Sequence, residues 1–243
     1  MRVAIHQPQY MPWLGYLAKW AAADAFVFLD TVQYEKNGWQ NRNRIKTANG
    51  PRWLTVPVRA RLGTPIHAVE VDTMQPWRAR HLHAIEDAYA HAPYLARHRE
   101  PLRRLYATDW PRLAPLAIAS AEWLARAMGI ATPAHLASTL GVDAAEPTER
   151  LIAVCRAVGG DVYLAGRDGA RYMNLRAFAR AGIGVQFQDY KHPAYTQLHG
   201  EFAPFLSGLD LLLTHGDDAL AILRSGDTWS LDPPGDNDTS ATA

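Results

Sequence analysis

The chain has 243 residues, of which 48% are hydrophobic and 20% are charged, and its formal net charge at pH 7 is +1. This composition is typical of a globular protein, and the near-neutral charge disfavours nucleic acid and charged membrane surfaces as partners. The single cysteine, Cys155, excludes an internal disulfide, and no apolar run approaches the roughly 18 residues of a membrane-spanning helix. Because no secretory signal is recognised, the expected location is the cytoplasm.

The first 30 residues predict a strand, a helix and a second strand. Residues 3–5 are a short β-rich run, and the apolar residues after Pro12 recur at helical spacing. Residues 25–29 are predicted to be a buried strand that ends at Asp30. Such a βαβ unit belongs to a parallel sheet with a right-handed crossover.

Residues 31–75 depart from this alternation. Asn49 and Gly50 predict a hairpin turn between two strand-like runs, so the range is predicted to be a small β excursion inserted after the second strand. Residues 76–128 contain three runs at helical spacing, each beginning near a proline, and are predicted to be a helical insertion.

Strand–helix alternation resumes in the second half. Residues 147–158 are predicted to be an amphipathic helix, and residues 162–164 and 183–190 are predicted to be strands. The fold class is therefore predicted to be α/β, with one Rossmann-like domain over residues 1–224 and a parallel sheet of about five strands. The polar residues 225–243, rich in Pro, Gly and Asp, are predicted to be a disordered tail.

Polar residues follow several of these strands. His6 and Gln7 follow the first strand, Asp30 the second and Gly166 a later one. Because ligands of open α/β sheets bind at the carboxyl ends of the strands, these residues are predicted to meet in one cleft. The candidate catalytic residues are His6, Asp30 and His192. The alternative is structural, with His6 and Gln7 satisfying backbone groups at a buried strand end.

Candidates for substrate binding come from four polar stretches with interleaved aromatic residues. Their amides and cations suit polar or anionic ligands, and their rings suit planar ones. The candidates are Gln7, Gln9, Tyr10, Trp13 and Lys19; Gln33, Lys36, Asn41, Arg42 and Lys46; Gly166 and Tyr172; and Asp189, Tyr190, Tyr195 and Gln197. The alternatives are core packing for Trp13, a solvated hairpin face for the second group and a loop pinned by its own tyrosines for the last. Asp210, flanked by leucines, is interpreted as a structural carboxylate.

Several site types lack their sequence signatures. There is no HExxH or CxxC motif and no G-x-S-x-G elbow, so no metal ligand is predicted. Cys155 lies on the apolar face of its helix, where a buried cysteine acts as a small apolar residue. The sequence identifies no cofactor.

Four long segments resemble the WbqC-like protein family. They are "VAIHQPQYMPWLGYLAKW", "FVFLDTVQYEKNGWQNRNRIKTANGPRWLTVPV", "DVYLAGRDGARYMN" and "FQDYKHPAYTQLHGEFAPFLSGLDLLLTHG". The resemblance implies a role in bacterial surface-polysaccharide (O-antigen) or natural-product biosynthesis and a group-transfer activity, but it supplies no catalytic residues. The first βαβ unit also resembles nucleotidylyltransferase-like domains, although Gly15 and Tyr16 replace the second histidine of their HxGH motif.

Three hypotheses follow. The first is an enzyme that transfers an acyl or aminoacyl unit to an amino sugar or similar polar acceptor, with His6 as general base and Lys19, Arg42 and Lys46 holding an anionic donor. The second is nucleotide-dependent activation or nucleotidyl transfer, and the third is a non-catalytic binding or scaffold protein of a polysaccharide assembly. The expected partner is a small polar or anionic substrate with a carrier-bound or nucleotide-bound donor.

One geometric prediction tests the strand-end hypothesis. Six residues are predicted to line one pocket, with the hairpin folding over it as a lid that carries Arg42 inward. They are His6, Gln7, Asp30, Arg42, Gly166 and Tyr190.

Overall fold

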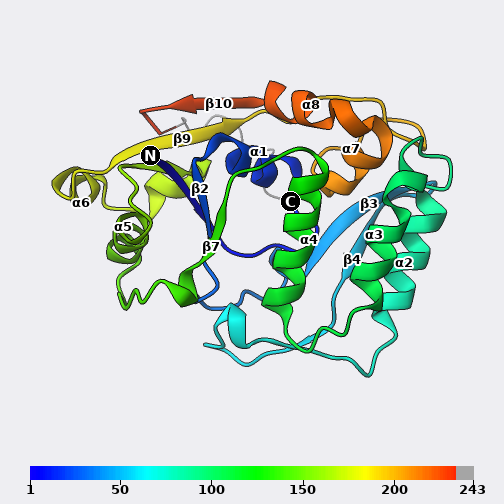
Figure 1. The fold of residues 1–243 in the computed structure, drawn as a ribbon, viewed down its shortest axis with the longest axis horizontal. Helices are drawn as coiled ribbons and strands as arrows, with labels where there is room; N and C mark the ends of the chain where they lie inside the picture. Colours follow the sequence, from blue (N-terminus) through cyan, green and yellow to red (C-terminus); the bar gives the residue numbers. More distant parts are fainter. Residues whose placement is uncertain (234–243) are drawn as a thin grey trace.

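A six-stranded sheet forms the centre of the molecule in the computed structural model, which describes residues 1–233 (Figure 1). The strand order is β10-β9-β8-β1-β2-β7, in which all neighbours are parallel except β10, which is antiparallel to β9. The predicted α/β class with about five parallel strands is thus confirmed. The strands are β1 (Arg2–His6), β2 (Ala25–Phe28), β7 (Ala134–Leu136), β8 (Val162–Ala165), β9 (Gly184–Tyr190) and β10 (Asp227–Ser230).

Helices cover both faces of this sheet because successive side chains of a strand point to opposite faces. In β1, Val3 and Ile5 join the core under α5 (Pro147–Ala157) and α6 (Leu175–Arg180). Ala4, between them, joins the larger core on the other face. That core includes residues of α1 (Leu14–Ala22), α4 (Leu113–Ala127), α7 (Gly208–His215) and α8 (Ala219–Ser225). In Figure 1, α5 and α6 lie on the left and α4 lies on the right.

Two small antiparallel strand pairs and three helices lie between β2 and β7. The hairpin of β3 (Arg42–Thr47) and β4 (Gly50–Thr55) turns through Asn49, and Gly50 has a φ of 90°, which glycine adopts without steric cost. A second small antiparallel pair follows, and then three helices, of which the first two lie beside the hairpin on the right of Figure 1. These elements are β5 (Val58–Arg59), β6 (Glu70–Val71), α2 (Trp77–Ala88), α3 (Leu95–Ala107) and α4.

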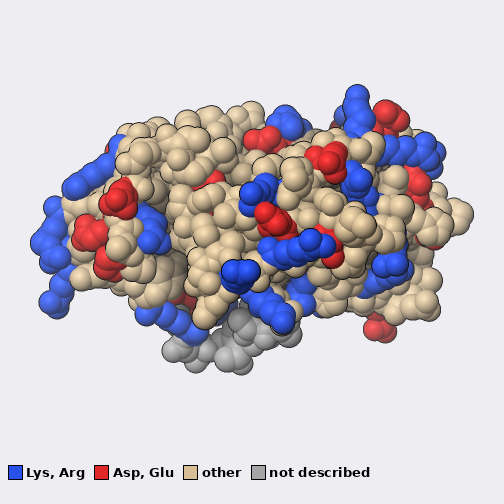
Figure 2. All heavy atoms as spheres, turned by 90° about the horizontal axis from the view of Figure 1, so that it is seen from below, with Lys and Arg blue, Asp and Glu red and all other residues tan. Residues whose placement is uncertain are grey.

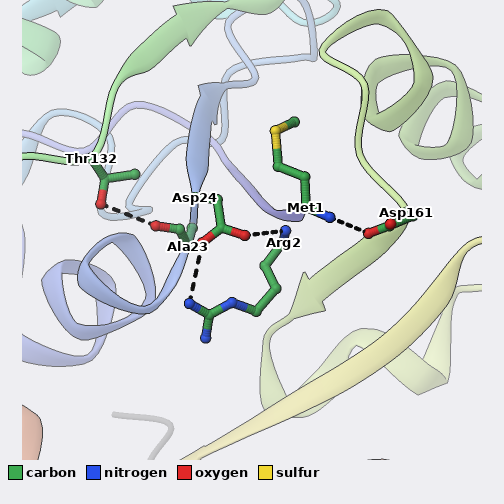
Figure 3. A network of polar contacts seen from close by, with 6 residues as sticks. All are labelled: Met1, Arg2, Ala23, Asp24, Thr132 and Asp161. Carbon is green, nitrogen blue, oxygen red and sulfur yellow. Dashed lines mark hydrogen bonds and ion pairs between the residues drawn. The ribbon is translucent and has the colours of Figure 1, made fainter.

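Polar contacts tie together the amino-terminal edge of the sheet (Figure 3). Asp24, before β2, accepts hydrogen bonds from the backbone N–H (2.7 Å) and the guanidinium (3.2 Å) of Arg2. The amino group of Met1 pairs with Asp161, before β8, and Thr132, before β7, donates to the carbonyl of Ala23 (3.1 Å). Four neighbouring strands are therefore linked at this edge, while the opposite edge carries the loops that form the candidate site.

The last strand departs from the prediction of a disordered tail from residue 225. Asp227–Ser230 form β10, which pairs with Phe187–Tyr190 of β9. The polar composition misled the sequence analysis because an edge strand with one exposed side tolerates Asp, Thr and Ser. Residues 234–243 lie outside the described residues.

The surface and helices give further information on partners. Lys and Arg side chains are interspersed with Asp and Glu on the face seen in Figure 2. None of the helices within residues 1–233 combines the length and apolar character that a membrane crossing requires.

Cys155 is buried, as predicted, and burial raises the pKa of its thiol to about 12.

Candidate functional site

A cavity of about 810 Å³ lies at the carboxyl-terminal edge of the parallel strands. Its volume falls in the range of roughly 300–1,000 Å³ that is typical of small-molecule sites. The ends of β1 and β9, the loop after β8, helix α1 and the loop after β2 all contribute to its walls. Among the predicted site residues, those that line it are His6, Gln7, Trp13, Lys19, Gly166, Tyr172 and Tyr190.

His6 enters the cavity as the last residue of β1. Its Nδ1 lies 3.2 Å from the carbonyl oxygen of Gln7. Because a carbonyl only accepts, Nδ1 carries the ring proton and Nε2 carries the lone pair. Burial, reinforced by the positive charge of Lys19, holds the pKa of His6 well below its usual value. The imidazole is therefore neutral at physiological pH, and its Nε2 is unprotonated.

Lys19 lies on α1 and is almost completely buried. Its Nζ is 3.7 Å from the position that a Cβ on Gly166 would take, so the two residues form one part of the wall. Burial lowers the pKa of Lys19 to about 8, and the carboxylate of Asp227 partly opposes this effect. Near neutral pH the lysine is mostly protonated, but it loses its proton at a lower pH than a surface lysine does.

Gln188 and Asp227 support this end of the cavity. The side-chain N–H₂ of Gln188 donates to the carbonyl of Gly15 (3.1 Å) and to Oδ1 of Asp227 (2.8 Å). The indole of Trp229 donates to the second carboxylate oxygen at 2.8 Å. Burial raises the pKa of Asp227, while these hydrogen bonds and Lys19 stabilise its charge. β10 thus brings a partly buried carboxylate close enough to the lysine to interact with its charge.

Aromatic side chains form a second wall. The rings of Trp13 and Tyr190 meet edge to face with centroids 5.6 Å apart, and Phe205 lies 5.7 Å from Trp13. The hydroxyl of Tyr190 donates to the carbonyl of Leu223 at 3.1 Å. Core packing and substrate binding were the two alternatives for Trp13, and its position is compatible with both, since it lines the cavity and also packs against the core.

Two arginines line the side of the cavity near α5. Arg150 donates to the carbonyls of Ala144 (2.9 Å) and Ala145 (3.0 Å). Arg167, in the loop after β8, pairs with Asp189 at 3.4 Å. Predicted candidate Asp189 therefore contacts the cavity through Arg167 and is not itself part of the lining.

Asp30 and Arg42 were predicted to line the pocket, but neither residue does so. Asp30 is buried and accepts hydrogen bonds from the backbone N–H (2.9 Å) and hydroxyl (2.7 Å) of Ser138. Arg42 donates to the carbonyl of Asn37, and its guanidinium lies over the Trp53 ring, 4.4 Å from the centroid. The lid with an inward Arg42 is thus wrong, because the guanidinium stacks on the hairpin's own tryptophan.

Five other candidates near the first loop and the hairpin lie outside the cavity, and three of them are buried. The Tyr10 hydroxyl contacts His81 at 3.0 Å and also Tyr106. The Asn41 amide donates to the carbonyl of Val56 at 2.8 Å. Gln9 is buried, Gln33 forms an isolated antiparallel β-bridge with Pro65 through its backbone, and Lys36 is exposed. None of these five candidates lines the cavity.

Candidates in the long loop after β9 form a separate buried network. Tyr195 donates to Asp210 (2.9 Å), which confirms the structural interpretation of that carboxylate. Lys46 donates to Gln197 (3.2 Å) and to two loop carbonyls, so it pins the loop and does not reach the cavity. His192 packs against the rings of neighbouring aromatic residues, and burial lowers its pKa. The loop is thus pinned by its own tyrosines, the alternative offered above.

Several residues that line the cavity were not predicted from the sequence. They include Tyr16, Glu35, Trp39, Arg150, Arg167 and Gln188. For Gln188 a signal existed, because period-2 alternation places it on the same face of β9 as Tyr190 and opposite to Asp189.

Comparisons with known proteins identify the family of the chain. The sequence profile of the WbqC-like protein family matches residues 7–222. The chain is similar to Rv1507c, an uncharacterized protein of Mycobacterium tuberculosis (strain ATCC 25618 / H37Rv), with 35% identity over 228 residues. That match covers 92% of this chain and 97% of the relative. No solved structure matches. The chain therefore belongs to the WbqC-like protein family.

Proposed function

We propose that this protein is a group-transfer enzyme that moves an acyl or aminoacyl unit onto a polar acceptor such as an amino sugar. The observation that carries the proposal is the neutral His6 in the wall of the cavity, beside the cationic Lys19. The family resemblance supports a place in bacterial surface-polysaccharide or natural-product biosynthesis, and we propose that the reaction takes place in the cytoplasm.

In the proposed reaction, Nε2 of His6 is the general base. It takes a proton from the acceptor's amine or hydroxyl as that atom bonds to the acyl carbon. The bond from the acyl carbon to the donor's leaving group then breaks, and the imidazolium returns its proton to the leaving group. Because His6 is neutral before this cycle, it can accept the proton without first losing one.

Lys19 and Arg167 hold the anionic part of the donor in this proposal. Lys19 was predicted for this role, and Arg167 takes the place of Arg42 and Lys46, which lie outside the cavity. Lys19 is a compact charge, whereas the guanidinium of Arg167 offers several donors in one plane. The pairing of Arg167 with Asp189 keeps that plane oriented before a ligand arrives.

A transfer assay with a matched variant tests the proposal. Purified protein is incubated with labelled acyl or aminoacyl donors and amino-sugar acceptors, and the product is followed by mass spectrometry. We expect transfer by the unaltered protein and a loss of roughly 100-fold or more in His6→Gln, since general-base catalysis contributes about 10²–10⁴-fold. The control His91→Gln alters an exposed histidine and should retain the activity. Equal activity of His6→Gln and the unaltered protein would refute His6 as the base.

A nucleotide-dependent reaction is the second candidate, favoured by the volume of the cavity and by its two arginines. Binding of ATP or CTP, followed by release of pyrophosphate in the presence of an acid substrate, would support it. Tight binding of the acceptor with no turnover of any donor, unchanged in His6→Gln, would instead identify a binding protein.

A further inference from the structure

Tyr16 has a buried hydroxyl that has no hydrogen-bond partner among residues 1–233. Its side chain is only 1% exposed, yet it lines the cavity. A buried hydroxyl without a partner is unfavourable, and such groups in native structures call for an explanation.

Other buried tyrosines in the described part of the chain show that this fold supplies partners. Tyr89 donates to Asp210 at 2.8 Å, and Tyr195 donates to the same carboxylate at 2.9 Å. Tyr10 contacts His81 at 3.0 Å. Tyr16 differs from these three in that it borders the cavity.

The surroundings of Tyr16 indicate which chemical group would be the hydrogen-bond partner of its hydroxyl. Its ring meets the ring of His6 with centroids 4.6 Å apart. Lys19 follows it by three residues on α1, which places both side chains on one side of the helix. Burial raises the pKa of Tyr16 well above its usual value, so the hydroxyl keeps its proton and acts as a donor.

The charges around Lys19 come from several elements. His6 on β1 is neutral, Gln188 on β9 is polar, and Asp227 on β10 is the carboxylate that interacts with the lysine. The first turn of α1 has no acidic residue, so the positive end of the helix dipole is not neutralised there. Tyr16 and Lys19 thus offer donors and positive charge, which an oxygen with negative charge complements.

We infer that Tyr16 is a ligand-binding residue, whose hydroxyl donates a hydrogen bond to a carboxylate or phosphate oxygen of the molecule that occupies the cavity beside Lys19. The inference deepens the proposed function, because it names the chemical group that the donor presents, and it rests on that function only in sharing the cavity. It does not require His6 to be a base.

A pair of tyrosine-to-phenylalanine variants tests the inference. Thermal unfolding of the full chain is measured with increasing sodium phosphate or sodium acetate, against sodium chloride at equal ionic strength. In Tyr16→Phe the unpaired hydroxyl is gone, so we expect the Tm without ligand to rise by roughly 2–4 °C. The affinity for the stabilising anion should fall roughly 10-fold or more. The control Tyr89→Phe removes a satisfied hydroxyl and should lower the Tm while leaving the anion affinity unchanged.

Each outcome decides the matter. A higher Tm with a weaker anion response supports the inference, and the anion that stabilises more identifies carboxylate or phosphate as the preferred group. An unchanged anion affinity in Tyr16→Phe, a lower Tm of that variant, or no anion response in the unaltered protein would overturn it. An anion response lost in Tyr16→Phe, without any transfer activity, would defeat the transferase proposal and leave this inference standing.

Discussion

The indole of Trp13 lies against Gly15, and a Cβ built on Gly15 would come within 2.1 Å of Cη2 of that ring. The same indole contacts Tyr190 and Phe205, which also line the cavity. The position of this aromatic wall therefore depends on the absence of a side chain at residue 15.

Gly15→Ala should displace the Trp13 indole. We expect a loss of about 1–3 kcal/mol in the free energy of unfolding from overpacking, although alanine favours a helix by up to about 1 kcal/mol. Urea unfolding measures the change, and tryptophan fluorescence reports the altered ring environment. The control is Gly184→Ala, whose added Cβ meets its nearest atom at 3.7 Å. Unaltered fluorescence and stability in Gly15→Ala would contradict the packing described.

Lys19→Met should reveal the cost of burying a charge. Burial lowers the pKa of Lys19 to about 8, whereas an unfolded lysine titrates near 10.5. Between these values the unfolded chain binds more protons, so the stability of the unaltered protein rises with pH in that window. Relative to Lys19→Met, its free energy of unfolding should increase by about 1 kcal/mol between pH 7 and pH 9.

Denaturant titrations at the two pH values measure this difference. Lys191→Met, which alters an exposed lysine, is the matched control and should show no such trend. A constant gap between the unaltered protein and Lys19→Met would mean that Lys19 titrates normally.

His81 should make the protein sensitive to acid. Burial lowers the pKa of His81 to about 4, while its unfolded value is near 6.5. In that interval the unfolded state binds more protons, so stability falls as the pH is lowered from 6.5 to 4, by about 3 kcal/mol from this residue. His81→Gln should flatten the profile, whereas His83→Gln, an exposed neighbour on α2, should not. Parallel profiles for the two variants would count against this origin of acid sensitivity.

Asp30→Ala should affect stability more than ligand binding. The variant leaves the backbone N–H and the hydroxyl of Ser138 without their acceptor, and we expect a loss of about 1–3 kcal/mol. Ser138→Ala removes one of the two hydrogen bonds and should cost less. Calorimetry gives the stability change, and the anion titration gives the affinity. An Asp30→Ala protein that keeps its stability but loses its affinity for the anion would show that Asp30 contributes to ligand binding.

Much of the fold could be predicted because periodicity reports burial. The apolar run before His6 and the alternation before Tyr190 follow from which faces of the sheet are covered. The hairpin at Asn49 and Gly50 was predictable because few other residues tolerate such a turn. β10 was missed because Asp227 and Thr228 suit a tail as well as an edge strand, and only pairing with β9 decides between them.

The site was less predictable because function depends on long-range contacts. Residues at the ends of β1 and β8, such as His6 and Gly166, could be placed by topology alone. Arg42 could not, because its direction depends on Trp53, which lies diagonally across the hairpin from it. The role of Asp227 could not be predicted either, because it depends on contacts with Gln188 and Lys19, which lie far from it in sequence.

The last strand also protects the molecule from self-association. β10 covers the outer edge of β9, so Asp227–Ser230 occupy backbone groups that would otherwise face solvent. A shortened chain that ended at residue 222, where the family match stops, would lose this strand and uncover Phe187–Tyr190 of β9. A long bare edge of this kind is a template for pairing with other chains. Shortened versions prepared for crystallisation or expression should therefore keep residues 227–230, or they will tend to aggregate as well as lose the carboxylate beside Lys19.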